Sequence, residues 1–181
     1  MTRAGRGIAL AAALGASSCG YALLGHGITV DPSIKRIGVP QFRDQTGKAG
    51  LDQRITENVI AELLKRGRFD VVSQADGVDA VVEGELVSYN VVPVGFSEAT
   101  DLANAGTTTQ ASRYAVVLTA RVRYAKTGQS EAIWETDAFS VRDEYDVGDD
   151  PAAFFDQEEQ AIDRLSTSFA RSLVSAMLEA F

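Results

Sequence analysis

The chain has 181 residues, with 17 basic and 25 acidic side chains and a formal charge of −8. This acidic balance argues against nucleic acid as a partner, because proteins that bind phosphate backbones carry an excess of positive charge. The only histidine, His26, and the only cysteine, Cys19, leave no means of building Ser/His/Asp or Cys/His catalytic sites, intramolecular disulfides or the usual zinc sites.

The first eighteen residues follow the order of a lipoprotein signal peptide. Arg3 and Arg6 form a cationic start, residues 8–16 are apolar, and two serines precede Cys19. The apolar run is roughly half the ~20 residues that a spanning helix needs, so it can be translocated but cannot remain as an anchor. We therefore expect cleavage before Cys19 and acylation of its thiol, with palmitate among the chains. No other cofactor is expected.

The segment after the cysteine predicts where the mature protein lies. Gly20 stands where an aspartate usually signals inner-membrane retention, so we expect a lipid anchor in the outer membrane, on its periplasmic face. Residues 19–34 contain glycine and proline with little periodicity and are predicted to be the lipidated tether. Residues 35–181 are long enough for one domain with its own core. Without residues 1–18, 15 basic and 25 acidic side chains remain, a formal charge of −10.

The first elements predicted in the domain are a strand, a helix and a short strand. Residues 36–42 are predicted to form a strand. Because Pro40 has no N–H to donate to a ladder, we expect this strand to lie at a sheet edge or to end there. From Leu51, apolar residues recur at steps of four, which predicts an amphipathic helix of about four turns. Gly67 is expected to end that helix with a positive φ. Residues 69–72 follow as a short strand.

A longer strand begins at Ala80. Its apolar parity changes partway along, which predicts a bulge near Leu86 or Val87. Residues 96–112 are rich in small polar side chains without a period, and we interpret them as a mobile loop that could also make contacts.

Two regular strands and a long helix complete the chain. Residues 113–124 alternate, with one apolar face and one face carrying arginines, and residues 133–145 return after a turn at 126–129. Asp150 before Pro151 predicts the start of a helix of about 28 residues. The predicted fold is α+β, a two-layer sandwich in which two helices pack on one face of a mostly antiparallel four- to five-stranded sheet. The other face is expected to stay open.

Two groups of carboxylates suggest alternative chemistry. Glu83 and Glu85 share a strand face about 7 Å apart, which could suit a peptidoglycan-acting glycosidase, although a solvated strand edge is the simpler interpretation. A second group lacks the EF-hand pattern for calcium, and we interpret it as charge at a helix start. Its members are Asp143, Glu144, Asp146, Asp149 and Asp150.

Several segments together resemble the LptE family of lipopolysaccharide-assembly lipoproteins, the partners of the outer-membrane barrel LptD. The run Cys19-Gly20-Tyr21-Ala22-Leu23-Leu24-Gly25 is similar to the family's C-G-Y-x-L-x-G. Further similar segments, in the family's order, are 37–42 with Thr46, 54–57, 68–72, 82–86, 134–135 and 142–145. The resemblance covers nearly the whole mature chain.

The resemblance implies a non-enzymatic plug and chaperone for an LptD-type β-barrel that assists lipopolysaccharide transport and insertion. It further implies lipopolysaccharide as a ligand of basic residues on the exposed sheet face and nearby loops. Guanidinium groups match phosphates well, and the alternative interpretation is that these cations only solubilise the strand. The candidate contacts are Arg113, Arg121, Arg123, Lys126 and Arg142.

A second resemblance stays open at this point. A first strand ending in Pro-x-Phe, a helix, and the run 67–72 (Gly-Arg-Phe-Asp-Val-Val) are also similar to the α/β domains of curli-secretion and TolB-like periplasmic proteins. Membership there would make the chain a different envelope-assembly component. The post-cysteine run favours the LptE family.

Overall fold

Two strands, a helix, four strands and a second helix follow one another along the chain. The computed structural model describes residues 31–101, 106–147 and 151–179, so the signal peptide, Cys19, most of the tether and the predicted Asp150 cap lie outside the described residues. The elements are β1 (Arg36–Gly38), β2 (Arg43–Asp44), α1 (Leu51–Lys65), β3 (Asp70–Val72), β4 (Ala80–Asp101), β5 (Gly106–Lys126), β6 (Ala132–Asp146) and α2 (Pro151–Glu179).

The sheet has six strands. Five of them lie in the order β3-β1-β4-β5-β6, and β2 pairs with β4 outside this order. The β1–β3, β1–β4 and β2–β4 pairs are parallel, whereas β4–β5 and β5–β6 are antiparallel. The predicted α+β class is confirmed, but the sheet is mixed and has six strands rather than four or five. The parallel part arises because α1 carries the chain across between β1 and β3, and such a crossover joins parallel strands.

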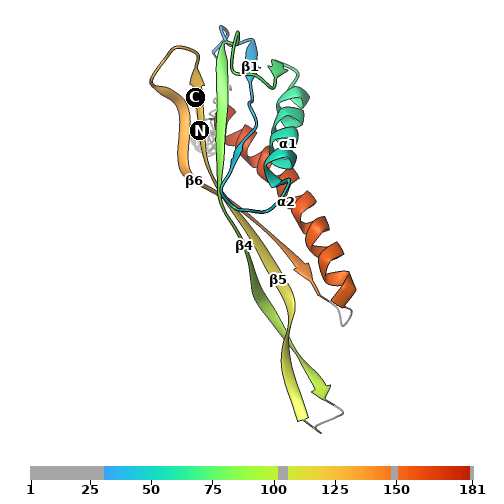
Figure 1. Cartoon of the computed structure of the whole chain (residues 1–181). Coiled ribbons are helices and arrows are strands. Elements are labelled where there is room, and N and C mark those ends of the chain that lie inside the picture. Colours follow the sequence, from blue (N-terminus) through green and yellow to red (C-terminus); the bar gives the residue numbers. More distant parts are fainter. Residues whose placement is uncertain (1–30, 102–105, 148–150, 180–181) are drawn as a thin grey trace, which may run out of the picture.

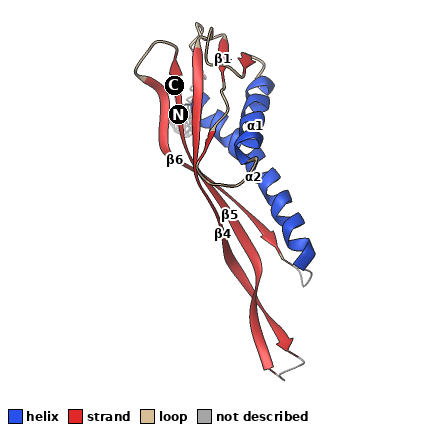
Figure 2. Ribbon diagram, in the orientation of Figure 1, coloured by secondary structure: helices blue, strands red, loops and turns tan. Residues whose placement is uncertain are grey.

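Both helices cover the same face of the sheet, as predicted (Figures 1 and 2). The predicted stripe of α1 is buried at Leu51, Ile55, Val59 and Leu63. The longer α2 runs diagonally beside α1 and over β6, and its buried residues include Ile162, Leu165, Phe169 and Leu173. Burial of these apolar side chains between helices and sheet supplies the main stabilisation of the fold.

The end of β1 and the loop after it depend on close packing. The predicted strand 36–42 is shorter, because β1 ends at Gly38 and Pro40 follows it outside the ladder. Phe42 then turns into the core, where its ring covers Gly84 so closely that a Cβ there would lie 2.2 Å from it. Gly84 is thus required for this packing. The predicted positive φ of Gly67, after α1, is confirmed at 66°.

Of two predictions made for the long hairpin of β4 and β5, one is confirmed and one is wrong. The ladder shifts register between Leu86 and Ser88, as the change of parity predicted. The described part of the segment predicted as a mobile loop, residues 96–101 and 106–112, is strand instead, because the ladder continues from the pair Phe96–Ala111 to the pair Asp101–Gly106. Residues 96–101 and 106–111, here named the arm, project beyond the end of β6 (Figure 1). Their threonines favour strand, while the absence of a buried face removes the alternation that identifies strands.

Candidate functional site

The sheet face turned away from the helices carries the arginines that the alternation of β5 placed there. The residues Val116, Leu118, Ala120 and Val122 are buried on the helix side, while Arg121 is exposed on the open face. The predicted alternation of β5 is therefore confirmed. The helix layer leaves this second face uncovered by any described element.

On the part of the open face near β2, positive and negative side chains alternate from strand to strand. Arg121 donates from Nη1 to Glu85 Oε2 at 2.7 Å and from Nε to Asp137 Oδ1 at 3.2 Å. Glu85 in turn lies opposite Arg43 in the register of β2 and β4. A hollow of about 150 Å³ on this face is lined by Arg43, Glu83, Gly84, Glu85, Arg121 and Arg123. The arrangement balances each guanidinium with a carboxylate of the same face.

The two glutamates considered for glycosidase chemistry flank this hollow. Glu85 accepts hydrogen bonds from Arg121 and from Gln45 Nε2, the latter at 2.6 Å. Its carboxylate is thus held by Arg121 of β5 and by Gln45, which follows β2. Glu83 lies opposite Arg123, which also lines the hollow. This geometry fits the simpler interpretation, a charged strand surface, since Glu85 is occupied by its ion pair.

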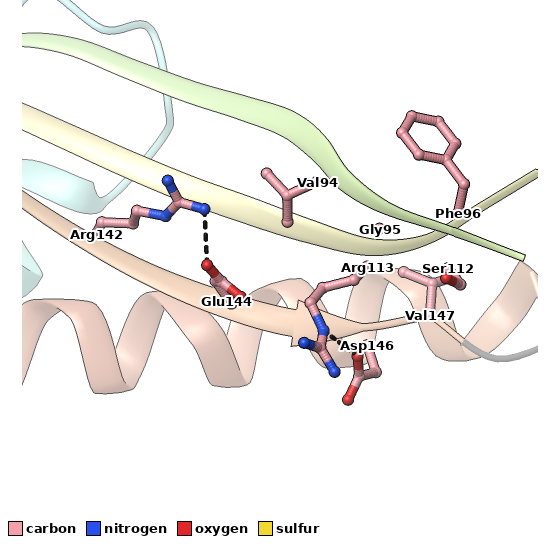
Figure 3. Close-up of a pocket in the computed structure, with 9 residues that line it drawn as sticks. All are labelled: Val94, Gly95, Phe96, Ser112, Arg113, Arg142, Glu144, Asp146 and Val147. Carbon is pink, nitrogen blue, oxygen red and sulfur yellow. Dashed lines mark hydrogen bonds and ion pairs between the residues drawn. The ribbon is translucent and has the colours of Figure 1, made fainter.

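A larger pocket, of about 500 Å³, lies where β6 ends and the arm begins (Figure 3). Arg113 donates from Nε to Asp146 Oδ1 at 2.7 Å, and Arg142 donates from Nη2 to Glu144 Oε1, also at 2.7 Å. The hydrogen bond and charge of Asp146 raise the pKa of Arg113 above its usual value, so this guanidinium stays protonated. The residues that line this pocket are Val94, Gly95, Phe96, Ser112, Arg113, Arg142, Glu144, Asp146 and Val147.

The structure separates the fifth candidate cation from the four arginines. Lys126 has the parity of buried Tyr124 and lies at the far end of β5 from Arg113, about 40 Å away along the strand. Its Nζ binds Asp31 Oδ2 and Ser33 Oγ, and this contact with Lys126 lowers the pKa of Asp31 well below its usual range. Lys126 therefore fixes the start of the folded chain to β5 rather than joining the arginine face.

The acidic cluster near residue 145 is part of β6, so its interpretation as helix-start charge is wrong for the three residues that the structure describes. Glu144 and Asp146 pair with the pocket arginines, and Asp143 Oδ2 accepts from Arg164 Nε at 2.9 Å. Asp149 and Asp150 lie outside the described residues. In the part of the chain that the structure describes, no group of three His, Cys, Asp or Glu side chains could hold a metal ion.

One polar network was missed by the reasoning from sequence. Glu158 of α2 is 9% exposed, and its Oε1 accepts from Lys48 Nζ at 2.9 Å and from the Tyr89 hydroxyl at 2.8 Å. Burial by itself would raise the pKa of Glu158, but the two hydrogen bonds and the charge of Lys48 outweigh it and lower that pKa. The three residues come from separate segments, so no spacing in the sequence could have identified them.

Together these observations define an α+β domain that presents an open, ion-paired sheet face and a projecting two-stranded arm. No helix among the described residues is long and apolar enough to cross a membrane. The family model for LptE, lipopolysaccharide-assembly, matches residues 34–177. The chain therefore belongs to the LptE lipopolysaccharide-assembly family, which confirms the first of the two resemblances.

A solved structure with a TM-score above 0.5 agrees on the fold. Protein XCC0632 from Xanthomonas campestris is 12% identical, with 81% of this chain and 85% of that chain covered and a TM-score of 0.52. At this identity the likeness shows the fold alone. The rare lipoprotein B from Shewanella oneidensis is 13% identical over 78% of this chain and 94% of its own, with a TM-score of 0.46. A minor lipoprotein from Acinetobacter baumannii is 11% identical over 81% and 92%, with a TM-score of 0.47. No curated protein sequence matches the chain.

Proposed function

We propose that this chain is an outer-membrane lipoprotein that assembles with an LptD-type β-barrel, as its plug and chaperone, and assists lipopolysaccharide transport to the cell surface. The observation that carries the proposal is the family match over residues 34–177, which covers nearly all of the predicted domain. Acylation of Cys19 would supply the anchor at the periplasmic face of the outer membrane.

The open sheet face supports a role in binding a protein. Helices cover only one side of the sheet, so a continuous surface of β4, β5 and β6 is left for a partner. Lipopolysaccharide is a further proposed ligand, through Arg113, Arg121, Arg123 and Arg142. Because Arg121 already pairs with Glu85 and Asp137, a phosphate would have to displace a carboxylate there. Barrel binding is therefore proposed as the primary activity.

Co-purification tests this proposal directly. A tagged full-length chain is purified from detergent-solubilised membranes of its own organism, and the proteins that co-elute are identified by mass spectrometry. We expect a large outer-membrane β-barrel of the LptD type in stoichiometric amount. Recovery of a curli-type secretion pore, or of no barrel, would refute the proposal.

A further inference from the structure

The outer edge of β6 has no neighbouring strand in the part of the chain that the structure describes, since β6 pairs only with β5. An open strand edge is a template for pairing with another chain. The ladder with β5 shifts register between the pairs Ala120–Phe139 and Val122–Thr136, and it is regular from Phe139 to Asp146. A new strand could therefore pair regularly only along residues 139–146.

Glu144 lies in this regular part, and side chains occupy both of its backbone groups. Its N–H donates to Asp143 Oδ1 at 2.7 Å, and its carbonyl oxygen accepts from Arg164 Nη2 at 3.1 Å. Arg164 Nε also donates to Asp143 Oδ2 at 2.9 Å. These three hydrogen bonds form one closed group, and we name Asp143 and Arg164 the edge cap.

The edge cap lies on the side of β6 away from β5. In an antiparallel ladder, alternate residues exchange both backbone hydrogen bonds with the neighbouring strand, and the residues between them point away from it. Glu144 gives both groups to side chains and so points away, and the same alternation makes Arg142 and Ser140 point away. The uncapped remainder, residues 139–142, is shorter than a typical strand of about five to six residues.

Residues 141–145 are self-complementary in antiparallel pairing. If two copies pair about Asp143, Arg142 of each copy lies opposite Glu144 of the other, and Val141 lies opposite Tyr145. Opposite charges, and an aromatic with a β-branched residue, are cross-strand pairs that stabilise a sheet. This register also brings together residues whose backbone groups point outward. A second copy of this chain, related by a two-fold axis, therefore fits the edge.

We propose that the edge cap keeps the outer edge of β6 closed to a second copy of this chain. Pairing about Asp143 needs the N–H and the carbonyl of Glu144 in each copy, and the cap occupies both. The side chains of Arg164 and Asp143 are 51% and 24% exposed, so they can be replaced without opening the core. The proposal concerns contacts between copies and does not depend on the proposed barrel partner.

Co-expression of two full-length copies with different tags tests the edge cap. The first tag is purified from detergent-solubilised membranes, and the recovered second tag is quantified. We expect Asp143→Ala combined with Arg164→Ala to raise this recovery at least about tenfold over wild type, because each copy gains a free backbone donor and acceptor. The control, Glu131→Ala combined with Arg171→Ala, removes one acid and one arginine from other exposed positions and should raise nothing.

A charge exchange tests the register of the pairing. Adding Arg142→Glu to the double variant places two glutamates opposite each other, and we expect the recovery to return to the wild-type level. Adding Glu144→Arg as well restores opposite charges, so the recovery should rise again. Circular dichroism of each purified variant checks that its fold is unchanged.

Wild-type recovery from the folded double variant, or an equal rise in the control, would overturn the proposal. Association that persists with Arg142→Glu would place the contact elsewhere and refute it too. If the double variant does not fold, Arg164→Ala alone frees the Glu144 carbonyl, and a recovery equal to wild type would then be decisive against the cap. Loss of the barrel from the wild-type eluate would refute only the proposed function.

Discussion

Thr56 shows how one side chain in α1 fixes a segment distant in the sequence. Its Oγ1 accepts a hydrogen bond from the Phe42 N–H at 3.0 Å and donates one to the Asp52 carbonyl at 2.7 Å. Thr56 is 6% exposed, so water cannot replace it as a partner of the Phe42 N–H. The threonine thereby holds the chain that brings Phe42 over Gly84.

Substituting Thr56 tests this role. Thr56→Val keeps the shape but leaves the buried Phe42 N–H without an acceptor, and we expect it to lower the free energy of unfolding by about 1–3 kcal/mol. Thr56→Ser keeps the hydroxyl and should cost less. Urea unfolding followed by circular dichroism compares the two. If the serine variant were the less stable one, the role of the hydrogen bond would be refuted.

The alternation of β5 identified the arginines of the open face, but it did not predict their ion-pair partners. The sequence predicted that Arg121 and Arg123 share a face, and the structure adds that Arg121 is paired with two carboxylates. Ion pairs between exposed groups contribute little to stability, so these arginines can be exchanged without unfolding the protein. A specific ligand role is therefore testable by charge reversal.

We expect Arg121→Glu combined with Arg123→Glu to lower lipopolysaccharide retention by roughly tenfold, because charged hydrogen bonds to phosphate are lost, while barrel binding persists. The measurement is the amount of lipopolysaccharide that co-purifies with the complex. The matched control, Lys65→Glu combined with Arg171→Glu, makes the same change of charge on the helix layer. Equal retention by both variants would mean that the open-face arginines only solubilise the strand.

At the scale of elements, α2 is attached to the rest of the molecule by charge as well as by its apolar stripe. Glu158 connects α2 to Tyr89 of β4 and to Lys48 in the loop before α1. Nearby, Arg54 of α1 pairs with Glu159 and Asp163. These contacts join the two helices and the sheet around Tyr89 of β4.

The lowered pKa of Glu158 predicts a pH-dependent stability. The carboxylate is better stabilised in the folded state, so its contribution is complete above its unfolded pKa of 4.5 and is lost as pH falls through the lower folded value. Glu158→Gln should thus cost about 1–3 kcal/mol at pH 7, and the difference from wild type should shrink towards pH 3.

Urea unfolding of both proteins at pH 7, 5 and 3 measures this difference. Glu159→Gln serves as the control, because its carboxylate is 54% exposed and should show a small effect at every pH. A difference between Glu158→Gln and wild type that stays constant with pH would contradict the assigned role of the ion pair.

At the scale of the whole molecule, the first described residue and the arm lie at opposite ends of the long sheet. Asp31, the first described residue, is bound to Lys126 at one end of β5, and the arm lies at the other. The 21 residues of β5 correspond to about 70 Å. The arm therefore lies far from the point where the described chain begins.

Cys19→Ala should release the protein from the membrane. Acyl chains contribute about 0.8 kcal/mol per buried CH₂, and without the thiol no diacylglyceryl group can be attached. We expect the variant to move from the membrane pellet to the soluble fraction and to lose metabolic labelling by an alkyne analogue of palmitate. Ser17→Ala is the control that keeps both. Labelling that persists in Cys19→Ala would refute lipidation at this residue.

The sequence alone determined the elements whose apolar period is set by a buried face. This applies to the stripe of α1, to the alternation of β5 and to the parity change at Leu86, because burial imposes a pattern on local sequence. The family membership could also be read from ordered short segments. The arm could not be predicted as two strands, since its side chains at 96–98 and 107–110 are exposed and its threonines follow no period.

Only the tertiary structure decided which charges neutralise one another and which surfaces remain free. Glu158 meets Lys48 and Tyr89, and Asp146 meets Arg113, through contacts between segments far apart in the chain. The parallel pairing of β1 with β3 likewise follows from the crossover of α1. Such choices depend on distances in the folded state, whereas local sequence encodes only what each segment must bury.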